Sequence, residues 1–288
     1  MRRKCALVAV SDEESGGKFG SVHLLDHDVR RDVWREDVVL NAEPGGMQAI
    51  RFAEKGTPMS TFTVRTPSGH GAFLHLTEGA VRVAVRLIAR LVDLEEFADF
   101  KVDPELREYL RRSDVRETID QIMGTGAADK MLRPTVNVGT ISGGNKVNTI
   151  PGLCVFEADM RLPIGLTAEV LQKRVAVILE DFPQAEMTVQ EAASNPFNSS
   201  GHDHEVVRAV QRNAEVVLGR NGDKGRVPLA IPSLGATDSK HWRYRGIPAY
   251  TYGSSPVGMG GRDESVDIDD FSNLIKIHAG AAWDYLHG

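Results

Sequence analysis

The chain has 288 residues, of which 41% are hydrophobic and 26% charged, and its formal net charge is -6 at pH 7. This length and composition are typical of a globular protein of two ordinary domains and argue against a disordered chain. The acidic balance argues against a nucleic-acid-binding protein, and no apolar run reaches the length of a membrane span. We therefore expect a cytoplasmic protein with no nucleic-acid or membrane partner. Cys5 and Cys154 are expected to be buried free thiols.

The first residues predict an α/β domain. The continuous apolar run at residues 5–10 is typical of a strand that is covered on both faces. A helix is expected to begin within residues 20–25. A second short strand, at residues 37–41, is expected to end at the Glu-Pro-Gly-Gly turn of residues 43–46.

From residue 58 the pattern changes to that of an antiparallel sheet. Residues 60–65 alternate in polarity, as in a strand with one exposed face. Thr77 is a candidate N-cap for a helix that ends near Val92, and Thr167 is a candidate N-cap for a second helix. Further strands are predicted at residues 135–141, 153–162 and 186–191, and a charged, helix-prone insertion at 93–131. These elements predict a four-stranded antiparallel sheet with two helices on one face.

The remaining residues return to an α/β pattern. Helices are predicted at 205–218 and 269–286, and strands before Asp238 and at 249–253. We therefore predict one α/β domain, formed by residues 1–57 and 194–288, that is interrupted by an α+β domain at residues 58–193.

Acidic side chains follow the ends of two predicted strands. Glu13 and Glu14 come after the first strand, and Glu43 comes after the second. In open α/β sheets, ligands bind at the carboxyl ends of the strands. Neighbouring extended residues point in opposite directions, so one carboxylate could bind a metal while the other acts as a general base. A solvated acidic turn is the alternative interpretation.

The order of these motifs resembles the M20 family of zinc aminoacylases and peptidases, which includes acetylornithine deacetylase, succinyl-diaminopimelate desuccinylase and the glutamate carboxypeptidases. The resemblance covers nearly the whole chain. It also includes His70 in Ser-Gly-His-Gly, Asn148 in Asn-Thr-Ile-Pro and Arg161 in Asp-Met-Arg. The segment 235–240, Gly-Ala-Thr-Asp-Ser-Lys, resembles the loop on the substrate side of the family's site.

The resemblance implies a role for each matched residue. Glu13 would be the catalytic base, and Glu14 and Glu43 would be metal ligands. The substrate would be bound by three polar residues, His70, Asn148 and Arg161. Of these, His70 would reach the active site of a partner subunit. In the family, the α+β domain predicted at residues 58–193 is called the lid. Asn148 and Arg161 are 13 residues apart, a separation that suggests the two strands of a hairpin with both side chains at one end of the lid sheet.

The activity implied by the resemblance is that of a two-zinc hydrolase, with Co²⁺ or Mn²⁺ as alternative metals. In such an enzyme the metals lower the pKa of a bridging water, and the resulting hydroxide attacks the amide bond of an N-acyl amino acid or small peptide. The lid domain would also form a homodimer.

Two metal-binding motifs of the family are absent from the chain. The family places a His-x-Asp motif and a bridging aspartate before the strand that leads to its adjacent glutamates. Here only eleven residues precede Asp12, and none is His, Asp or Glu. Gly260 stands where the family has its last histidine ligand. We therefore predict an N-terminally truncated, incomplete zinc-peptidase-like catalytic domain that is interrupted by a lid and dimerisation domain, with impaired activity.

Two other functions stay open. The chain could be a non-catalytic protein that keeps the lid for dimerisation or for binding a small molecule. It could also hold one metal at Glu14 and Glu43, whose oxygen ligands suit Mn²⁺ or Mg²⁺ better than zinc.

Overall fold

The computed structural model describes residues 4–34, 37–219 and 227–288, and the chain divides into two compact units. Unit 1 contains residues 1–54, 103–128 and 198–288, and unit 2 contains residues 55–102 and 129–197. These divisions lie a few residues from the predicted boundaries at 57/58 and 193/194, but residues 103–128 of the expected insertion group with unit 1. The domain boundaries stated from the sequence remain a prediction.

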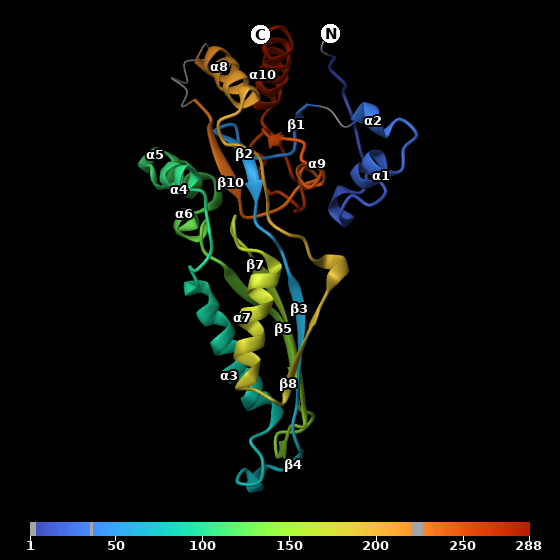
Figure 1. The fold of residues 1–288 in the computed structure, drawn as a ribbon, viewed down its shortest axis with the longest axis vertical. Coiled ribbons are helices and arrows are strands. Elements are labelled where there is room, and N and C mark those ends of the chain that lie inside the picture. The colour runs from blue at the N-terminus through green and yellow to red at the C-terminus, as the bar shows by residue number, and fades with distance from the viewer. Residues whose placement is uncertain (1–3, 35–36, 220–226) are drawn as a thin grey trace. The chain divides into compact units, whose positions relative to one another are not determined.

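Unit 2 is built on a four-stranded antiparallel sheet with the order β5-β7-β3-β8 (Figure 1). Its strands are β3 (Met59–Arg65), β5 (Thr135–Gly143), β7 (Leu153–Arg161) and β8 (Ala185–Val189). The two long helices α3 (Ala80–Val92) and α7 (Ala168–Glu180) pack on one face, and their apolar residues form one core with that face. The predicted mixed α/β fold with an antiparallel lid domain is therefore confirmed.

The alternation of buried and more exposed side chains along β3 and β7 shows which face of the sheet forms the core. In β3, Phe62 and Val64 are fully buried, and in β7 Phe156 stacks on Phe62 with ring centroids 4.8 Å apart. The shorter elements that complete this part of the chain are β4 (Gly69–His70), η2 (Gly71–Phe73), η3 (Asp93–Glu96), α6 (Ala127–Lys130), β6 (Thr149–Ile150) and η4 (Glu191–Ala193). Successive side chains of a strand point to opposite faces, so a period of two in the sequence is enough to select the buried set.

One predicted helix cap is confirmed and the other is wrong. The Thr167 hydroxyl accepts a hydrogen bond from the backbone N–H of Val170 at the start of α7. Helix α3, however, begins at Ala80 after Gly79, and Thr77 donates its hydroxyl to the carbonyl of Pro67. Gly79 has φ +85°, a conformation outside the right-handed helix, so the helix cannot extend back to Thr77.

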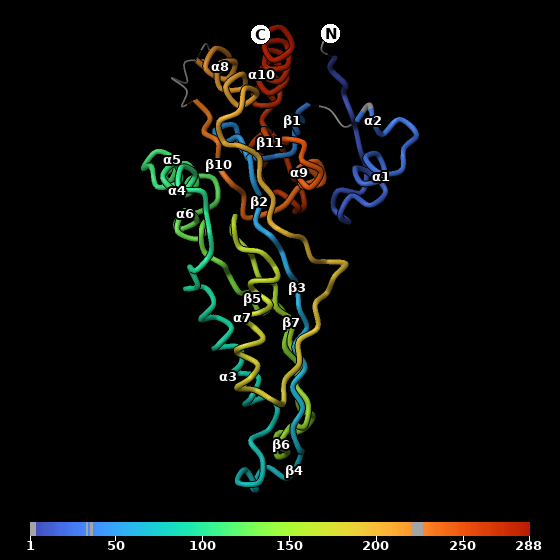
Figure 2. The backbone as a smooth tube through the Cα atoms, viewed as in Figure 1, coloured from blue at the N-terminus to red at the C-terminus, as the bar shows by residue number. Residues whose placement is uncertain are grey.

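Unit 1 contains a mixed sheet with the order β1-β11-β2-β10 (Figure 2). The short strand β9 also pairs with β2. The strands are β1 (Val39–Asn41), β2 (Ala49–Glu54), β9 (Asn198–Ser199), β10 (Leu229–Ser233) and β11 (Ala249–Thr251). The helices are η1 (Glu13–Ser15), α1 (Ser21–Asp26), α2 (Arg31–Trp34), α4 (Pro104–Arg111), α5 (Ser113–Met123), α8 (Glu205–Gly219), α9 (Ser239–Arg243) and α10 (Ile268–His287). Across the described ranges, none of the helices combines the length and apolarity required to cross a bilayer.

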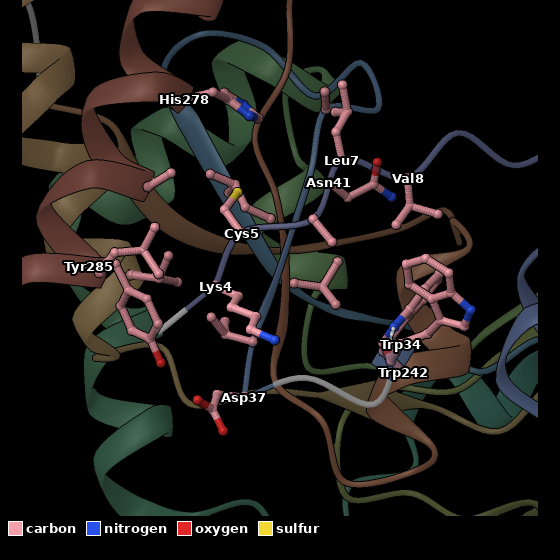
Figure 3. Close-up of a pocket in the computed structure, with 18 of the residues that line it drawn as sticks. Lys4, Cys5, Leu7, Val8, Trp34, Asp37, Asn41, Trp242, His278 and Tyr285 are labelled. Carbon is pink, nitrogen blue, oxygen red and sulfur yellow. Dashed lines mark hydrogen bonds between the residues drawn. The ribbon is translucent and has the colours of Figure 1, made fainter. Parts of the chain in front are cut away.

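The predicted strand at residues 5–10 is wrong. Residues 4–10 are exposed and belong to no sheet, and Cys5 is exposed, whereas Cys154 is buried as expected. Both this segment and β1 line a cavity of about 490 Å³, in which Figure 3 shows Cys5, Leu7 and Asn41. An apolar run forms a strand only where a neighbouring strand can pair with it, and here the cavity lies beside the run instead.

Candidate functional site

The acidic pair Glu13–Glu14 lies on the short 3-10 turn η1, which is closed by its own backbone. Asp12 has φ 72°, and its carbonyl accepts a hydrogen bond of 2.7 Å from the N–H of Gly17. The Asp12 carboxylate also accepts a hydrogen bond of 2.8 Å from the N–H of Phe19. Aspartate tolerates the left-handed conformation because its short side chain can bond to the local backbone. The turn therefore presents Glu13 and Glu14 from a fixed loop instead of from a strand end.

Glu43 follows β1 and belongs to the same group of charges. Burial and the neighbouring carboxylates of Glu43 and Asp238 together raise the pKa of Glu13 to about 7, against the opposing effect of the Lys240 ammonium group. Burial also raises the pKa of Glu43, with contributions from Glu14 and Asp238. Like charges within interaction distance disfavour each other's ionised form. The structure therefore brings together the three acidic residues that the sequence singled out.

Asp238 is a fourth carboxylate of this group, and sequence reasoning did not assign it a role. Its side chain is 4% exposed, and neither oxygen has a hydrogen-bond partner among the described residues. The nearest imidazole nitrogen, Nε2 of His241, lies 3.5 Å from Oδ1. Burial lowers the pKa of His241, so the ring is neutral at pH 7 and provides no counter-charge. The only sequence signal for Asp238 was its place in the loop 235–240 that resembles the family's substrate side.

These side chains do not form a zinc site by themselves. Within residues 4–34, 37–219 and 227–288, no group of three or more His, Cys, Asp or Glu side chains could hold a metal ion. The four clustered donors are all carboxylates, whereas zinc sites in proteins normally include imidazole or thiolate ligands. Gly260 lies in an exposed loop and donates its N–H to the carboxylate of Glu264. The described residues therefore do not fit a zinc ion.

His70 and Asn148 lie together at one end of unit 2. The two-stranded sheet β4-β6 pairs His70 with Thr149, and the N–H of Gly71 donates to the carbonyl of Asn148 at 2.8 Å. His70 is exposed, and its Nδ1 accepts a hydrogen bond of 3.3 Å from the N–H of Ala72. The remaining ring nitrogen, Nε2, therefore carries the proton and can donate to a ligand.

The expectation that Asn148 and Arg161 share one end of the lid sheet is wrong. Asn148 lies in the connection between β5 and β7, whereas Arg161 is the last residue of β7 and pairs with Thr135 at the open end of the same hairpin. Nine residues of β7 separate the two ends, which corresponds to about 30 Å at about 3.3 Å per residue. The Arg161 guanidinium is bound to Asp159 at 2.7 Å. The 13-residue separation could not show that the two side chains lie at opposite ends, because it does not tell which residues form the hairpin turn.

Comparison with known proteins identifies the lid. Residues 52–186 match the family model of the peptidase dimerisation domain of the M20 group. This part of the chain is therefore similar to an M20 peptidase dimerisation domain. This match covers the sheet β5-β7-β3 and helices α3 and α7, together with the loop of His70 and the start of β8.

Relatives of the M20 group match almost the whole chain. A succinyl-diaminopimelate desuccinylase of Marinobacter nauticus is 24% identical over 281 residues, which are 96% of this chain and 65% of the relative. An M20 family metallo-carboxypeptidase from Sulfolobus solfataricus has a TM-score of 0.69 at 20% identity, over 96% of this chain and 69% of its own. A tripeptidase from Staphylococcus aureus has a TM-score of 0.68 at 16% identity, over 97% and 63%.

These comparisons confirm the resemblance to the M20 family and its fold. The chain spans 65% of the length of the desuccinylase that it matches. The comparisons thus show the fold and a similarity of residues 52–186 to the M20 dimerisation domain.

Proposed function

We propose that this protein is an M20-type hydrolase that cleaves an amide bond in an N-acyl amino acid or a small peptide. The observation that carries the proposal is the environment of Glu13, whose carboxyl has a pKa near 7 among three other carboxylates. A general base works best when its pKa lies near the working pH, because it can then take up and return a proton. The names of its relatives, a desuccinylase, a carboxypeptidase and a tripeptidase, agree with amide hydrolysis.

The remaining residues have roles on the substrate side of this proposal. His70 offers an N–H to a developing oxyanion or to a substrate carbonyl, across a homodimer formed by the lid. Asn148 lies next to it and supplies an amide group. Arg161 is proposed to bind a substrate carboxylate, in exchange for part of its contact with Asp159.

The proposed metal ligands in this chain are Glu14 and Glu43. M20 relatives include a metallo-carboxypeptidase, so a divalent cation is expected in the active protein. Among the described residues, these two carboxylates belong to no group of three or more side chains that could hold a metal ion. Zinc, cobalt and manganese are therefore all tested. A site made of two carboxylates binds manganese in preference to zinc, because oxygen ligands suit manganese better.

A non-catalytic function is the second candidate. It is favoured by the lack of a metal-holding group among the described residues and by the match of residues 52–186 to a dimerisation domain. In this case the lid would provide dimerisation or bind a small molecule, and Glu13 would take no part in chemistry.

The test measures amine release from N-succinyl and N-acetyl amino acids, dipeptides and tripeptides, with Zn²⁺, Co²⁺ or Mn²⁺ and with EDTA. We expect metal-dependent release that falls about 100-fold or more in Glu13→Gln, because general-base groups contribute about 10² to 10⁴. The matched control is Glu186→Gln, the same change at an exposed carboxylate on β8, and should leave the rate unchanged. Full activity in Glu13→Gln would exclude the proposed base. A stable dimer without turnover under any metal would favour the non-catalytic function.

A further inference from the structure

The short helix α9 is bonded to the turn that carries Glu13 and Glu14. His241 Nε2 lies 3.1 Å from the carbonyl oxygen of Gly16, which directly follows that turn. A carbonyl oxygen can only accept a hydrogen bond, so Nε2 of the imidazole carries the proton and donates it. The residue is 8% exposed, and water therefore competes little for this bond.

The backbone of the turn also packs directly on α9. A Cβ atom added to Gly17 would lie 2.5 Å from Oδ1 of Asp238, 2.5 Å from the Ser21 hydroxyl and 3.0 Å from Nε2 of His241. Gly17 also has φ +71°, which disfavours other residues. Glycine at this position therefore allows the turn to approach α9 at a distance that any side chain would prevent.

The same helix is linked to Glu43 through one intermediate side chain. Asn41 donates its amide N–H to the hydroxyl of Ser239 at 3.1 Å, and its amide oxygen accepts the N–H of Glu43 at 2.9 Å. Ser239 is fully buried, and its hydroxyl also bonds to the hydroxyl of Thr251 at 3.0 Å. Ser239 and His241 are thus two residues apart on α9 and reach the two acidic segments separately.

Helix α9 is itself held rigidly. Thr237, just before the helix, donates both its N–H and its hydroxyl to Glu54, at 3.0 and 2.7 Å. Arg243, its last residue, pairs with the same carboxylate at 3.2 Å, and both charged side chains are buried. A buried pair that is bonded on all sides cannot move without leaving a charge unpaired. The ends of α9 are therefore tied to the end of β2.

We propose that His241 and Ser239 are positioning residues that set the spacing between the Glu13–Glu14 turn and Glu43. His241 holds the turn by its carbonyl, and Ser239 holds Glu43 through Asn41. Misplacement of a reacting group by about 1 Å can reduce a rate about 100-fold, so this spacing matters for chemistry. The catalytic meaning of the inference rests on the proposed hydrolase function, but the positioning itself does not.

Amide hydrogen exchange, measured by mass spectrometry, tests the positioning without any activity. The N–H groups of Gly16 and Gly17 are bonded within the turn, at 2.9 and 2.7 Å, and exchange slowly as long as the turn is held. We expect His241→Ala to accelerate exchange about tenfold in a peptide covering residues 12–22. His241→Gln should restore slow exchange because its amide nitrogen reaches the position of Nε2, whereas the shorter His241→Asn should not.

Two further variants separate this effect from general loosening. His278 on α10 also bonds through Nε2 to a backbone carbonyl, that of Tyr252 at 2.8 Å, so His278→Ala is the matched control and should leave residues 12–22 unchanged. Ser239→Ala should accelerate exchange at Glu43 with little effect on residues 12–22. If His241→Ala does not fold, the comparison of His241→Gln with His241→Asn decides the question.

Unchanged exchange in both His241→Ala and His241→Asn would overturn the inference, as would an equal acceleration in His278→Ala. If the protein hydrolyses amides, His241→Ala should also lower kcat at least tenfold with KM within twofold, and His241→Gln should recover most of it. If no hydrolysis is found, the proposed function fails, and hydrogen exchange still decides the positioning.

Discussion

Lys55 is a buried ammonium group in unit 2. The residue is 3% exposed, and Nζ donates to the carbonyl of Arg133 at 2.7 Å. Burial and the nearby Lys130 lower the pKa of Lys55 to about 8, against the opposing effect of Glu95. A lysine in this setting is charged at pH 7 only at a free-energy penalty to the folded state.

This penalty predicts a pH dependence of stability. The folded pKa lies below the unfolded value near 10.5, so between pH 8 and 10.5 the unfolded chain holds a proton that the folded chain has released. The contribution of Lys55 to stability should therefore rise with pH in this window, by about 2 kcal/mol between pH 8 and 9.5. Urea unfolding at several pH values measures it.

Lys55→Met is the variant for this test, because it keeps the apolar stem and removes the charge. It should be more stable than the unmodified protein at pH 7, and its stability should rise less between pH 8 and 9.5. Lys146→Met, at an exposed position, should keep the original pH dependence. Identical pH profiles for Lys55→Met and the unmodified protein would contradict a lowered pKa of the buried Lys55 amine.

At the level of elements, the lid sheet depends on one aromatic contact between its central strands. Phe62 of β3 lies opposite Phe156 of β7, and the rings are stacked with an interplanar angle of 6°. Both side chains are fully buried below α3 and α7. Removal of either ring would leave a cavity in a close-packed core, because the sheet cannot collapse around it.

Phe62→Ala should therefore lower the free energy of unfolding by about 3 to 5 kcal/mol. Phe73→Ala, the same change at a side chain that is 50% exposed on η2, should change it by less than about 0.5 kcal/mol. Denaturant unfolding followed by circular dichroism compares the two. Equal effects would mean that the sheet and helices do not form one packed core.

At the level of the whole molecule, the lid has a strand edge that another chain could cover. β5 is one of the two outer strands of the sheet, and its Ile141 lies opposite Phe156 on the helix side, yet remains 52% exposed. Edge strands present unpaired backbone groups and readily pair with a second chain. We propose that two copies meet at this edge, in keeping with the dimerisation domain.

Light scattering coupled to size exclusion should then give twice the chain mass of 31.5 kDa. Ile141→Lys should shift the equilibrium towards monomer, because it places a charge in the interface. Val29→Lys, at an exposed position in unit 1, is the control and should remain dimeric. A monomeric mass for the unmodified chain would contradict the proposed homodimer.

The sequence by itself determined the lid and the ordered set of motifs. Polarity that alternates every second residue at 60–65 and the cap at Thr167 are local signals, and each produced the predicted element. Glu13, Glu14 and Glu43 were singled out as acidic residues after strand ends, and their charges interact in the structure, although Glu13 and Glu14 lie on a turn that follows no strand. Their catalytic and metal-binding roles stay predictions.

Tertiary structure alone decided the rest. The apolar run at 5–10 is not a strand, because pairing depends on a neighbour that the run itself does not specify. Arg161 lies a strand length away from Asn148, because the hairpin turn, and not the spacing, sets which end each residue occupies. Ser239 and His241 reach the acidic residues across about 200 positions of sequence. Such contacts arise only when distant segments pack, and no local pattern records them.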